Sequence, residues 1–316
     1  MNKIITNRYK GLFAILIVCH HIALSVSNLP IYLIPLKYIG FSVVGYFLFI
    51  SGYGLMYGYK NKNDYLNGFI QKKISRILLP YLCIQIVWLL YCICTGKFVL
   101  IEYIQNFCGG GTNWFVIMII LYYVVWYLAF SHYNDKVAFF IVSIWVVITF
   151  VVCIWMNLES NWYASLLPIV VGMRMLEDYK YILHWIKKNS WKYIALTGGT
   201  YAFLFGMRIV LQEYGWNGKI FQGLLRNCIA VMFCFLIVGL QQKISLEGKV
   251  FDFLGKIYWE VYLVHILILK ICKWNLKLEG YMLVAITIGM SIIGACILKL
   301  FVEVTFKEKD KKFKSH

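Results

Sequence analysis

The chain has 316 residues, of which 61% are hydrophobic and only 14% are charged. Soluble domains are typically about 45–50% apolar and about 25% charged, so this composition excludes an ordinary soluble protein. Long apolar runs recur along the chain and predict an all-α, polytopic membrane protein. The net charge of +17 comes from basic residues that cluster in alternate connections between these runs. That distribution is typical of membrane topology and argues against nucleic acid as a partner.

About ten apolar runs are long enough to cross roughly 30 Å of hydrocarbon as helices. In chain order they are 11–27, 38–57, 77–95, 114–130, 137–156, 161–176, 193–211, 220–240, 253–271 and 280–304. We therefore expect one membrane domain over residues 1–306, followed by a basic tail over residues 307–316.

The positions of the 31 lysines and arginines predict which way the chain crosses the membrane. Most of them lie in the N-terminal segment, in every second connection and in the C-terminal tail. The opposite connections carry only Lys37, Lys97, Lys219, Lys273 and Lys277. Because basic connections stay on the cytoplasmic side, both termini are expected in the cytoplasm, in a multi-pass protein of the cell (plasma or inner) membrane. The basic tail is expected to contact anionic lipid headgroups.

Several ionisable side chains fall inside the predicted spans, where each is costly unless it is paired or solvated. They are His20, His21, Arg208, Arg226, Glu260 and His265. Such residues are candidate functional residues by default. The ten cysteines show no zinc-site spacing, so no metal is expected.

Lys10 and His21 lie three helical turns apart, on one face of the first span. At about 1.5 Å per residue, His21 lies roughly 16 Å deeper than Lys10, whereas His20 points about 80° away from this face. A cation at the mouth and a deep imidazole suit a tunnel in which histidine takes a proton from an acceptor hydroxyl. The same spacing also fits a lysine that reaches the headgroups and a histidine that bonds to another helix.

Two other basic or acidic groups allow both a functional and a structural interpretation. His265 lies at a depth comparable with His21, with Glu260 five residues before it. The two side chains could shift the pKa of a catalytic base, or they could form a hydrogen-bonded group with a structural role. Lys73 and Arg76 share a face at the start of the third span, where a basic pair either holds phosphates or sets topology.

Two uncharged residues are further candidates. Ser51 lies in "FISGYG", where it is either a nucleophile or part of a small-residue packing face. Trp114 opens the fourth span after three glycines, a position typical of the interfacial aromatic belt.

Taken together, these stretches resemble the acyltransferase family 3 integral membrane proteins, which O-acylate surface carbohydrates and related acceptors. The first helix of that family carries Arg or Lys, ten residues and then His, which is similar to Lys10 and His21. The other matching motifs are "YFLFISGYG", Lys73-Ile-Ser-Arg76 followed by Pro80-Tyr81, Trp114-Phe115, "WYASLLPIVVGMRM" and the stretch 255–265. The resemblance covers nearly the whole chain, in order.

The resemblance implies roles for individual positions. His21 would be the catalytic base and Lys10 its basic partner, while Lys73 and Arg76 would contact the phosphates of cytoplasmic acyl-CoA, most often acetyl-CoA, as co-substrate. Glu260 and His265 match the late element of the family. The implied acceptor is a hydroxyl of a cell-surface or capsular polysaccharide or its lipid-linked precursor.

Two other functions fit the sequence. Helices with midplane histidines also suit a proton-coupled transporter or flippase of a lipid-linked sugar or small solute. A non-catalytic assembly factor is the third interpretation. Nothing in the sequence indicates a particular oligomeric state.

Overall fold

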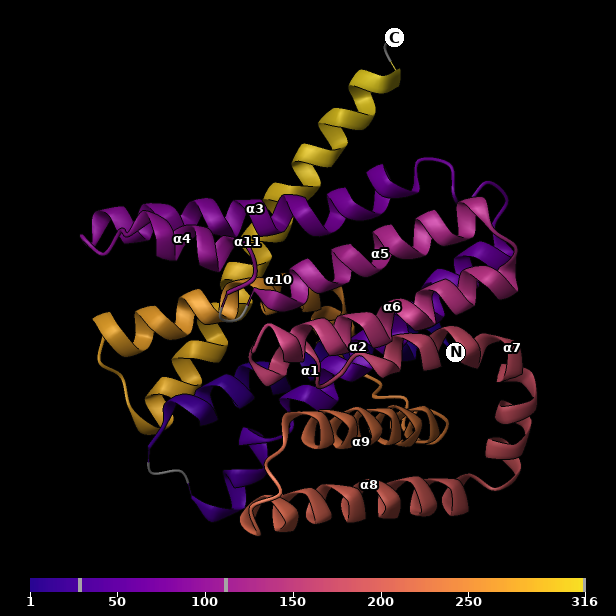
Figure 1. Cartoon of the computed structure of the whole chain (residues 1–316). Coiled ribbons are helices and arrows are strands. Elements are labelled where there is room, and N and C mark those ends of the chain that lie inside the picture. The colour runs from indigo at the N-terminus through magenta and orange to yellow at the C-terminus, as the bar shows by residue number, and fades with distance from the viewer. Residues whose placement is uncertain (28–29, 111–112, 315–316) are drawn as a thin grey trace. The chain divides into compact units, whose positions relative to one another are not determined.

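The computed structural model describes the backbone of residues 1–27, 30–110 and 113–314, and their side chains except those of 177–180 and 306–314. Throughout these ranges the regular elements are helices, which confirms the predicted all-α class (Figure 1). Of the predicted basic tail, residues 307–314 continue the last helix, whereas their side chains and residues 315–316 lie outside the described part.

The α-helices in the described ranges are α1 (Lys3–Ser25), α2 (Gly40–Asn61), α3 (Phe69–Cys94), α4 (Leu100–Phe107), α5 (Trp114–His132), α6 (Asp135–Trp155), α7 (Leu167–Lys188), α8 (Ser190–Glu213), α9 (Lys219–Leu240), α10 (Lys249–Lys270) and α11 (Gly280–Lys314). Three shorter elements accompany them. They are the 3₁₀ helices η1 (Ile31–Lys37) and η2 (Ser160–Trp162) and the π-helical turn η3 (Ile271–Asn275).

Each predicted span overlaps one of these helices. The largest difference is at 161–176, where η2 precedes the helix and α7 begins only at Leu167. Pro168 occupies the first turn of α7, where a missing backbone N–H costs no helical hydrogen bond. The short helix α4 was not among the predicted elements.

Within the described residues, seven helices are long and apolar enough to cross a membrane, namely α2, α3, α5, α6, α8, α9 and α11. The other three predicted spans lie in α1, α7 and α10, which carry more polar and charged residues. The count of ten spans and the cytoplasmic position of both termini therefore stay predictions.

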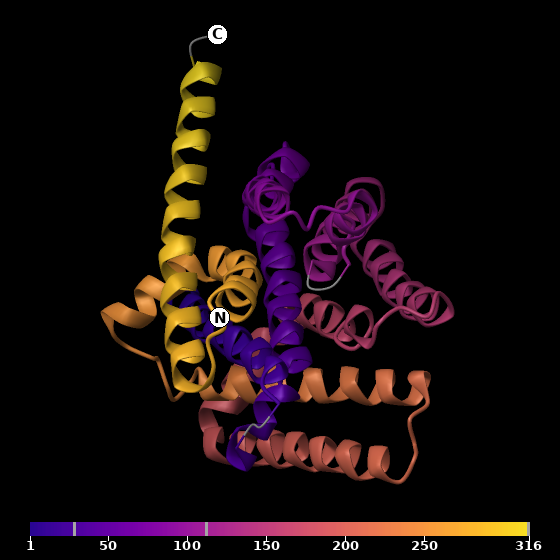
Figure 2. The same cartoon turned by 90° about the vertical axis from the view of Figure 1, so that its left-hand side faces the viewer.

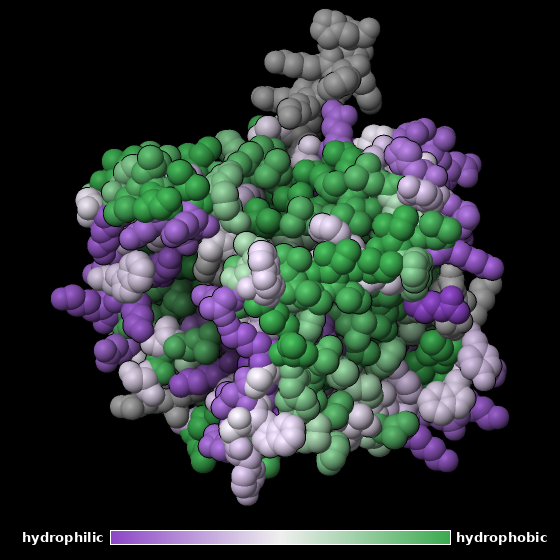
Figure 3. Space-filling model, viewed as in Figure 1, coloured by the Kyte–Doolittle hydropathy of each residue, from purple (hydrophilic) through white to green (hydrophobic). Residues whose placement is uncertain are grey.

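Large apolar side chains are exposed along one face of α6, at Val137, Phe140, Ile144, Val147 and Val151. Their spacing of three and four residues places them on a single stripe of the helix. The face of the molecule seen in Figure 3 is likewise rich in hydrophobic residues. Exposed apolar surface of this extent is suited to lipid rather than to water.

The chain divides into two compact units. Unit 1 comprises Met1–Gly40, Lys73–Val116 and Leu246–His316, and unit 2 comprises Phe41–Lys72 and Ile117–Ser245. In unit 1, α1 packs along α10, and α11 packs against α10 (yellow and orange in Figure 2).

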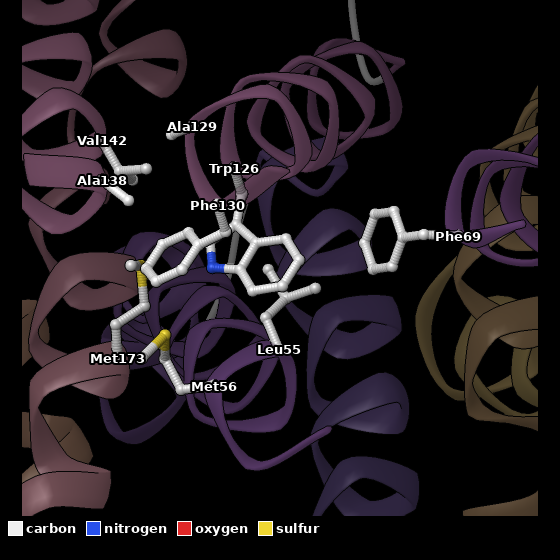
Figure 4. Close-up of a cluster of buried hydrophobic side chains, with 9 residues drawn as sticks. All are labelled: Leu55, Met56, Phe69, Trp126, Ala129, Phe130, Ala138, Val142 and Met173. Carbon is white, nitrogen blue, oxygen red and sulfur yellow. The ribbon is translucent and has the colours of Figure 1, made fainter. Parts of the chain in front are cut away.

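Unit 2 is held together by a buried cluster whose members come from α2, α3, α5, α6 and α7. They are Leu55, Met56, Phe69, Trp126, Ala129, Phe130, Ala138, Val142 and Met173 (Figure 4). The rings of Trp126 and Phe130 stack with centroids 4.8 Å apart, and Phe69 lies 5.2 Å from Trp126. Glycine also lets α2 and α7 approach closely, because a Cβ on Gly52 would collide with the carbonyl oxygen of Ile169.

Candidate active site

The two helices that carry His21 and His265 pack in parallel within unit 1. A Cβ on Gly11 would lie only 2.5 Å from the backbone nitrogen of Gly255, so both positions need glycine for the helices to touch. His21 and His265 each lie ten residues beyond the glycine of their own helix. This shared register brings the two imidazoles together, with ring centroids 5.1 Å apart.

An ion pair fixes the same register near the start of the two helices. Arg8 Nε donates a hydrogen bond to Asp252 Oδ1 at 2.6 Å, and Arg8 Nη2 lies 3.2 Å from Oδ2. This bidentate geometry is the strong form of a guanidinium–carboxylate contact. The contact is partly exposed, and it holds the pKa of the Asp252 carboxyl below its usual value.

His265 is buried, with 1% of its surface exposed, and one of its ring nitrogens makes a hydrogen bond within α10. Nδ1 lies 2.5 Å from the carbonyl oxygen of Tyr262, one helical turn earlier, and donates its proton there. This bond leaves Nε2 as a lone-pair acceptor in the neutral ring. Within the described part of the chain, Nε2 has no hydrogen-bond partner, so it is available to a bound group.

An aromatic wall holds Tyr262 in place. Phe115 meets the Tyr262 ring edge-on at 5.3 Å, and Trp259 stacks on it at 5.5 Å. Trp114 is buried and packs edge-on against Phe115. Trp114 therefore supports the wall behind His265.

A polar cavity opens beside His265, between α10, α3 and the segment that leads into α5. Its lining includes Gln85, Trp88, Asn106, Asn113, Tyr262, His265 and Lys270. Lys270 Nζ lies 4.2 Å from the centroid of the Trp88 ring, which is a close cation–π contact. The buried Gln85 Oε1 has no hydrogen-bond partner among the described residues.

The amide side chains of this cavity, on Gln85, Asn106 and Asn113, were not among the candidate residues predicted from the sequence. Asn113 Nδ2 donates to the carbonyl oxygen of Asn106 at 2.8 Å, and Tyr81 donates to the carbonyl of Phe107 at 2.6 Å. These bonds hold Asn113 against α4 and hold α4 against α3. The one sequence signal was Gln85, an amide inside an otherwise apolar span.

Lys10 lies at the opposite end of the His21 face. Its Nζ lies 5.1 Å from the centroid of the Tyr258 ring on α10. The predicted separation of roughly 16 Å between Lys10 and His21 holds, because α1 is continuous from Lys3 to Ser25. The structure thus brings His21 to His265 and leaves Lys10 near the start of the helix.

His20 has a different environment from its neighbour. His20 Nδ1 lies 2.7 Å from the carbonyl oxygen of Leu36 in η1, and the ring packs so closely on Gly40 that a Cβ there would collide with it. The His20 ring also lies edge-on to His21 at 5.0 Å. His20 therefore connects α1 to the segment that precedes α2.

Glu260 is directed away from the paired histidines. Its charged neighbours are Lys299 and Glu303 on α11, which are themselves 3.9 Å apart. The directions of the Glu260 and His265 side chains differ by about 140° around the axis of α10, so the two side chains contact different neighbours. The structure does not bring this carboxylate to His21.

The basic pair Lys73 and Arg76 lies near the start of α3, with Arg76 exposed. At about 1.5 Å per residue, Arg76 is roughly 14 Å along the helix from Gln85 in the cavity. Ser51, by contrast, belongs to unit 2, next to the close-packed Gly52. The described part of the chain holds no group of three or more His, Cys, Asp or Glu side chains that could bind a metal.

Membrane-length apolar helices and a polar, histidine-lined cavity together define a membrane protein with a buried polar site. The family model for acyltransferase family 3, described as an acyltransferase domain, matches residues 8–300. The chain belongs to this family and is a membrane acyltransferase. Comparison with curated proteins and with solved structures gave no significant match.

Proposed function

We propose that the protein transfers an acyl group, most simply acetyl, from cytoplasmic acyl-CoA to a hydroxyl of a cell-surface or capsular polysaccharide or its lipid-linked precursor. The pairing of His21 with His265 at 5.1 Å, beside a polar cavity, carries this proposal. An apolar protein gains nothing by packing a half-buried imidazole, His21, against the buried imidazole of His265 unless the pair has a function, and proton transfer is such a function.

In this mechanism His21 is the general base. It removes the proton from the acceptor hydroxyl while the oxygen attacks the thioester carbonyl, and the carbon–sulfur bond breaks. The protonated His21 then returns the proton to the departing sulfur of coenzyme A. General-base assistance of this kind contributes about 10²–10⁴-fold to rate.

His265 acts as a positioning residue for this base. Its Nδ1–H is fixed by the Tyr262 carbonyl, so its Nε2 can only accept a hydrogen bond. An acceptor at this point can orient the His21 ring or stabilise the proton that His21 gains. This arrangement resembles other sites in which a second group fixes the tautomer of a catalytic histidine.

Basic side chains near the helix starts suit the phosphates of acyl-CoA. Arg76 and Lys73 offer a guanidinium fork and a point charge, respectively, at one end of α3. Lys10 occupies the corresponding end of α1. In acyl-CoA the pantetheine arm separates the phosphates from the thioester. Such a donor fits a site in which the cations lie at one end of the helices and the cavity lies farther along them.

We assign Glu260 to the α10–α11 contact and Ser51 to helix packing.

A thiol-release assay on purified protein tests the proposed function. Coenzyme A should appear only when acetyl-CoA and a glycan acceptor are both present, and His21→Ala should reduce its release by about 10²–10⁴-fold. Solute uptake without thiol release would instead establish the transporter alternative. Normal release by a correctly folded His21→Ala protein would contradict the role of this base.

A further inference from the structure

Unit 2 contains a second polar cavity, with a volume of about 260 Å³. It lies where η2, the end of α8 and the start of α9 meet. Its lining consists of Ser160, Tyr163, Gln212, Asn217, Lys219, Gln222, Gly223 and Arg226. Two of these residues are cationic and, among the described side chains that line the cavity, none is a carboxylate. The volume approaches the lower end of ligand pockets, about 300–1,000 Å³.

Arg226 has only part of its hydrogen-bonding capacity used. Its Nη1 donates to Ser160 Oγ at 2.5 Å, whereas its buried Nε has no partner among the described residues. A guanidinium in an apolar helix is costly without an anion or acceptor. The free edge of this side chain is suited to an oxyanion, which guanidinium groups bind through parallel N–H bonds.

Gln222 supplies a complementary acceptor. It is 7% exposed, and its Nε2 donates to the carbonyl oxygen of Trp216 at 2.7 Å. Because a carbonyl oxygen can only accept, this bond identifies the amide atom that faces Trp216 as the nitrogen. The buried Oε1 then has no hydrogen-bond partner in the described part of the chain. A free carbonyl oxygen of this kind requires a donor such as a hydroxyl group.

The walls of the cavity are fixed by contacts within unit 2. Asn227 donates to the carbonyl oxygen of Tyr163 at 2.6 Å and accepts from the backbone N–H of Leu167 at 2.8 Å. A Cβ on Gly223 would lie 2.9 Å from both Phe150 and Tyr163, so α9 can approach only with glycine there. The cavity is therefore preorganised, which lowers the entropic cost of binding.

Arg208 adds a further positive charge close to this cavity. It is 3% exposed and lies over the ring of Phe41, 5.6 Å from its centroid. Arg208 Nη2 also lies 3.3 Å from Oε1 of Gln212, which lines the cavity. Its charge is held where water screens it weakly, so it strengthens the attraction for an anion.

We infer that this cavity binds the carboxylate and a neighbouring hydroxyl of an acidic sugar. The carboxylate lies between Arg226 and Lys219, and the hydroxyl donates to Gln222 Oε1. The inference rests on the proposed function in one respect: it identifies the glycan acceptor as one that contains acidic sugars. The connections around the cavity are those predicted to be extracytoplasmic, where such a glycan is found.

The test measures binding to the full-length protein in detergent, without any acyl donor, by isothermal titration calorimetry. The probes are glucuronate, glucose and glucose 6-phosphate. Glucuronate should bind about tenfold or more tightly than glucose, as expected for a charge-assisted hydrogen bond. Equal binding of glucuronate and glucose would overturn the inference. Tighter binding of glucose 6-phosphate than of glucuronate would overturn the choice of carboxylate.

Variants locate the binding. Arg226→Gln should weaken glucuronate binding about tenfold or more, and Arg226→Lys should restore part of it. Lys219 is exposed at the first residue of α9, where an acidic residue favours the helix, so Lys219→Glu should fold and should bind glucuronate more weakly. Lys192→Glu makes the same charge change near the other end of α8 and should bind normally.

Wild-type affinity in Arg226→Gln and Lys219→Glu would refute the site. His21→Ala should bind glucuronate normally, because His21 does not line this cavity. The two proposals can therefore fail separately. Loss of the proposed catalytic role would appear as unchanged thiol release in His21→Ala, whereas loss of this inference would appear as unchanged glucuronate binding in the cavity variants.

Discussion

The imidazole rings of His21 and His265 lie against each other, tilted by 44° and with centroids 5.1 Å apart, although 244 residues separate them in the chain. The same separation of 244 residues joins Arg8 to Asp252 near the start of the same helices. A constant offset means that α1 and α10 run in parallel and in register over at least three turns. This register is the physical basis of the first four predictions below.

His21→Ala should reduce acyl transfer by about 10²–10⁴-fold, because it removes the proposed general base. The unfolding temperature should change little, since His21 is only half-buried. Thiol release and thermal unfolding of the purified protein measure the two effects. His20→Ala is the matched control: it removes the neighbouring imidazole, which bonds to Leu36, and should retain clearly more activity than His21→Ala.

His265→Gln should retain more activity than His265→Leu, because only the glutamine offers an acceptor in place of Nε2. Both variants should leave the KM for acetyl-CoA close to the wild-type value, with the loss confined to kcat. Steady-state measurements of kcat and KM on both variants distinguish a role of His265 in positioning His21 from a role in packing alone. Equal kcat values for the two variants would show that the acceptor at this position has no role.

Gly11→Ala should lower stability by about 1–3 kcal/mol, the usual cost of overpacking, because the new Cβ would meet the Gly255 backbone. It should also lower activity by shifting His21 relative to His265. Gly199→Ala in α8 is the control: a Cβ there meets nothing within 4 Å, so the variant should be unchanged or slightly stabilised. Chemical denaturation and thiol release provide the comparison.

The Arg8–Asp252 contact makes stability depend on pH. Arg8 lowers the pKa of the Asp252 carboxyl, which lies before the predicted span 253–271. A lowered carboxyl pKa contributes stability that is complete above its unfolded value, about 3.9, and is lost as the pH falls through the folded value. Asp252→Asn should therefore flatten the fall in unfolding temperature below about pH 4. An unchanged pH profile would contradict this linkage.

Arg76→Gln should raise the KM for acetyl-CoA by about tenfold, as expected for loss of one charged phosphate contact, and should leave kcat nearly unchanged. Dephospho-coenzyme A thioester, which lacks one phosphate, should show a smaller difference between the variant and the wild type. Lys72→Gln is the control because Lys72 is exposed and its Nζ lies 3.4 Å from the carbonyl oxygen of Asn67. An equal KM in the wild type and in both variants would show that Arg76 does not contact the donor.

Hydropathy alone located the helices well. For example, the span predicted over 220–240 is α9, Lys219–Leu240, and the span over 137–156 is α6, Asp135–Trp155. Long apolar runs can satisfy their backbone hydrogen bonds in lipid only as helices, so composition fixes their type and approximate bounds. The exception, 161–176, contains a proline whose position in the first turn sets where α7 begins.

Helical periodicity also separated His21 from His20 correctly, because phase within one helix follows from sequence spacing. It could not show that Glu260 is directed toward α11, since that depends on which helix lies beside each face of α10. The second cavity could not be predicted either. Arg226 was a candidate as a charge in a span, but its hydrogen-bond partner Ser160 and its neighbour in the cavity, Gln222, were not.

The sequence by itself determined the membrane class, the helix positions, the face shared by Lys10 and His21 and the family resemblance. Only the tertiary structure decided that His21 meets His265. Residues three or four positions apart share a face because the backbone geometry is local. Contacts between helices depend on residues hundreds of positions apart, such as Gly11 and Gly255, whose close approach is a property of the packed helices and not of either segment alone.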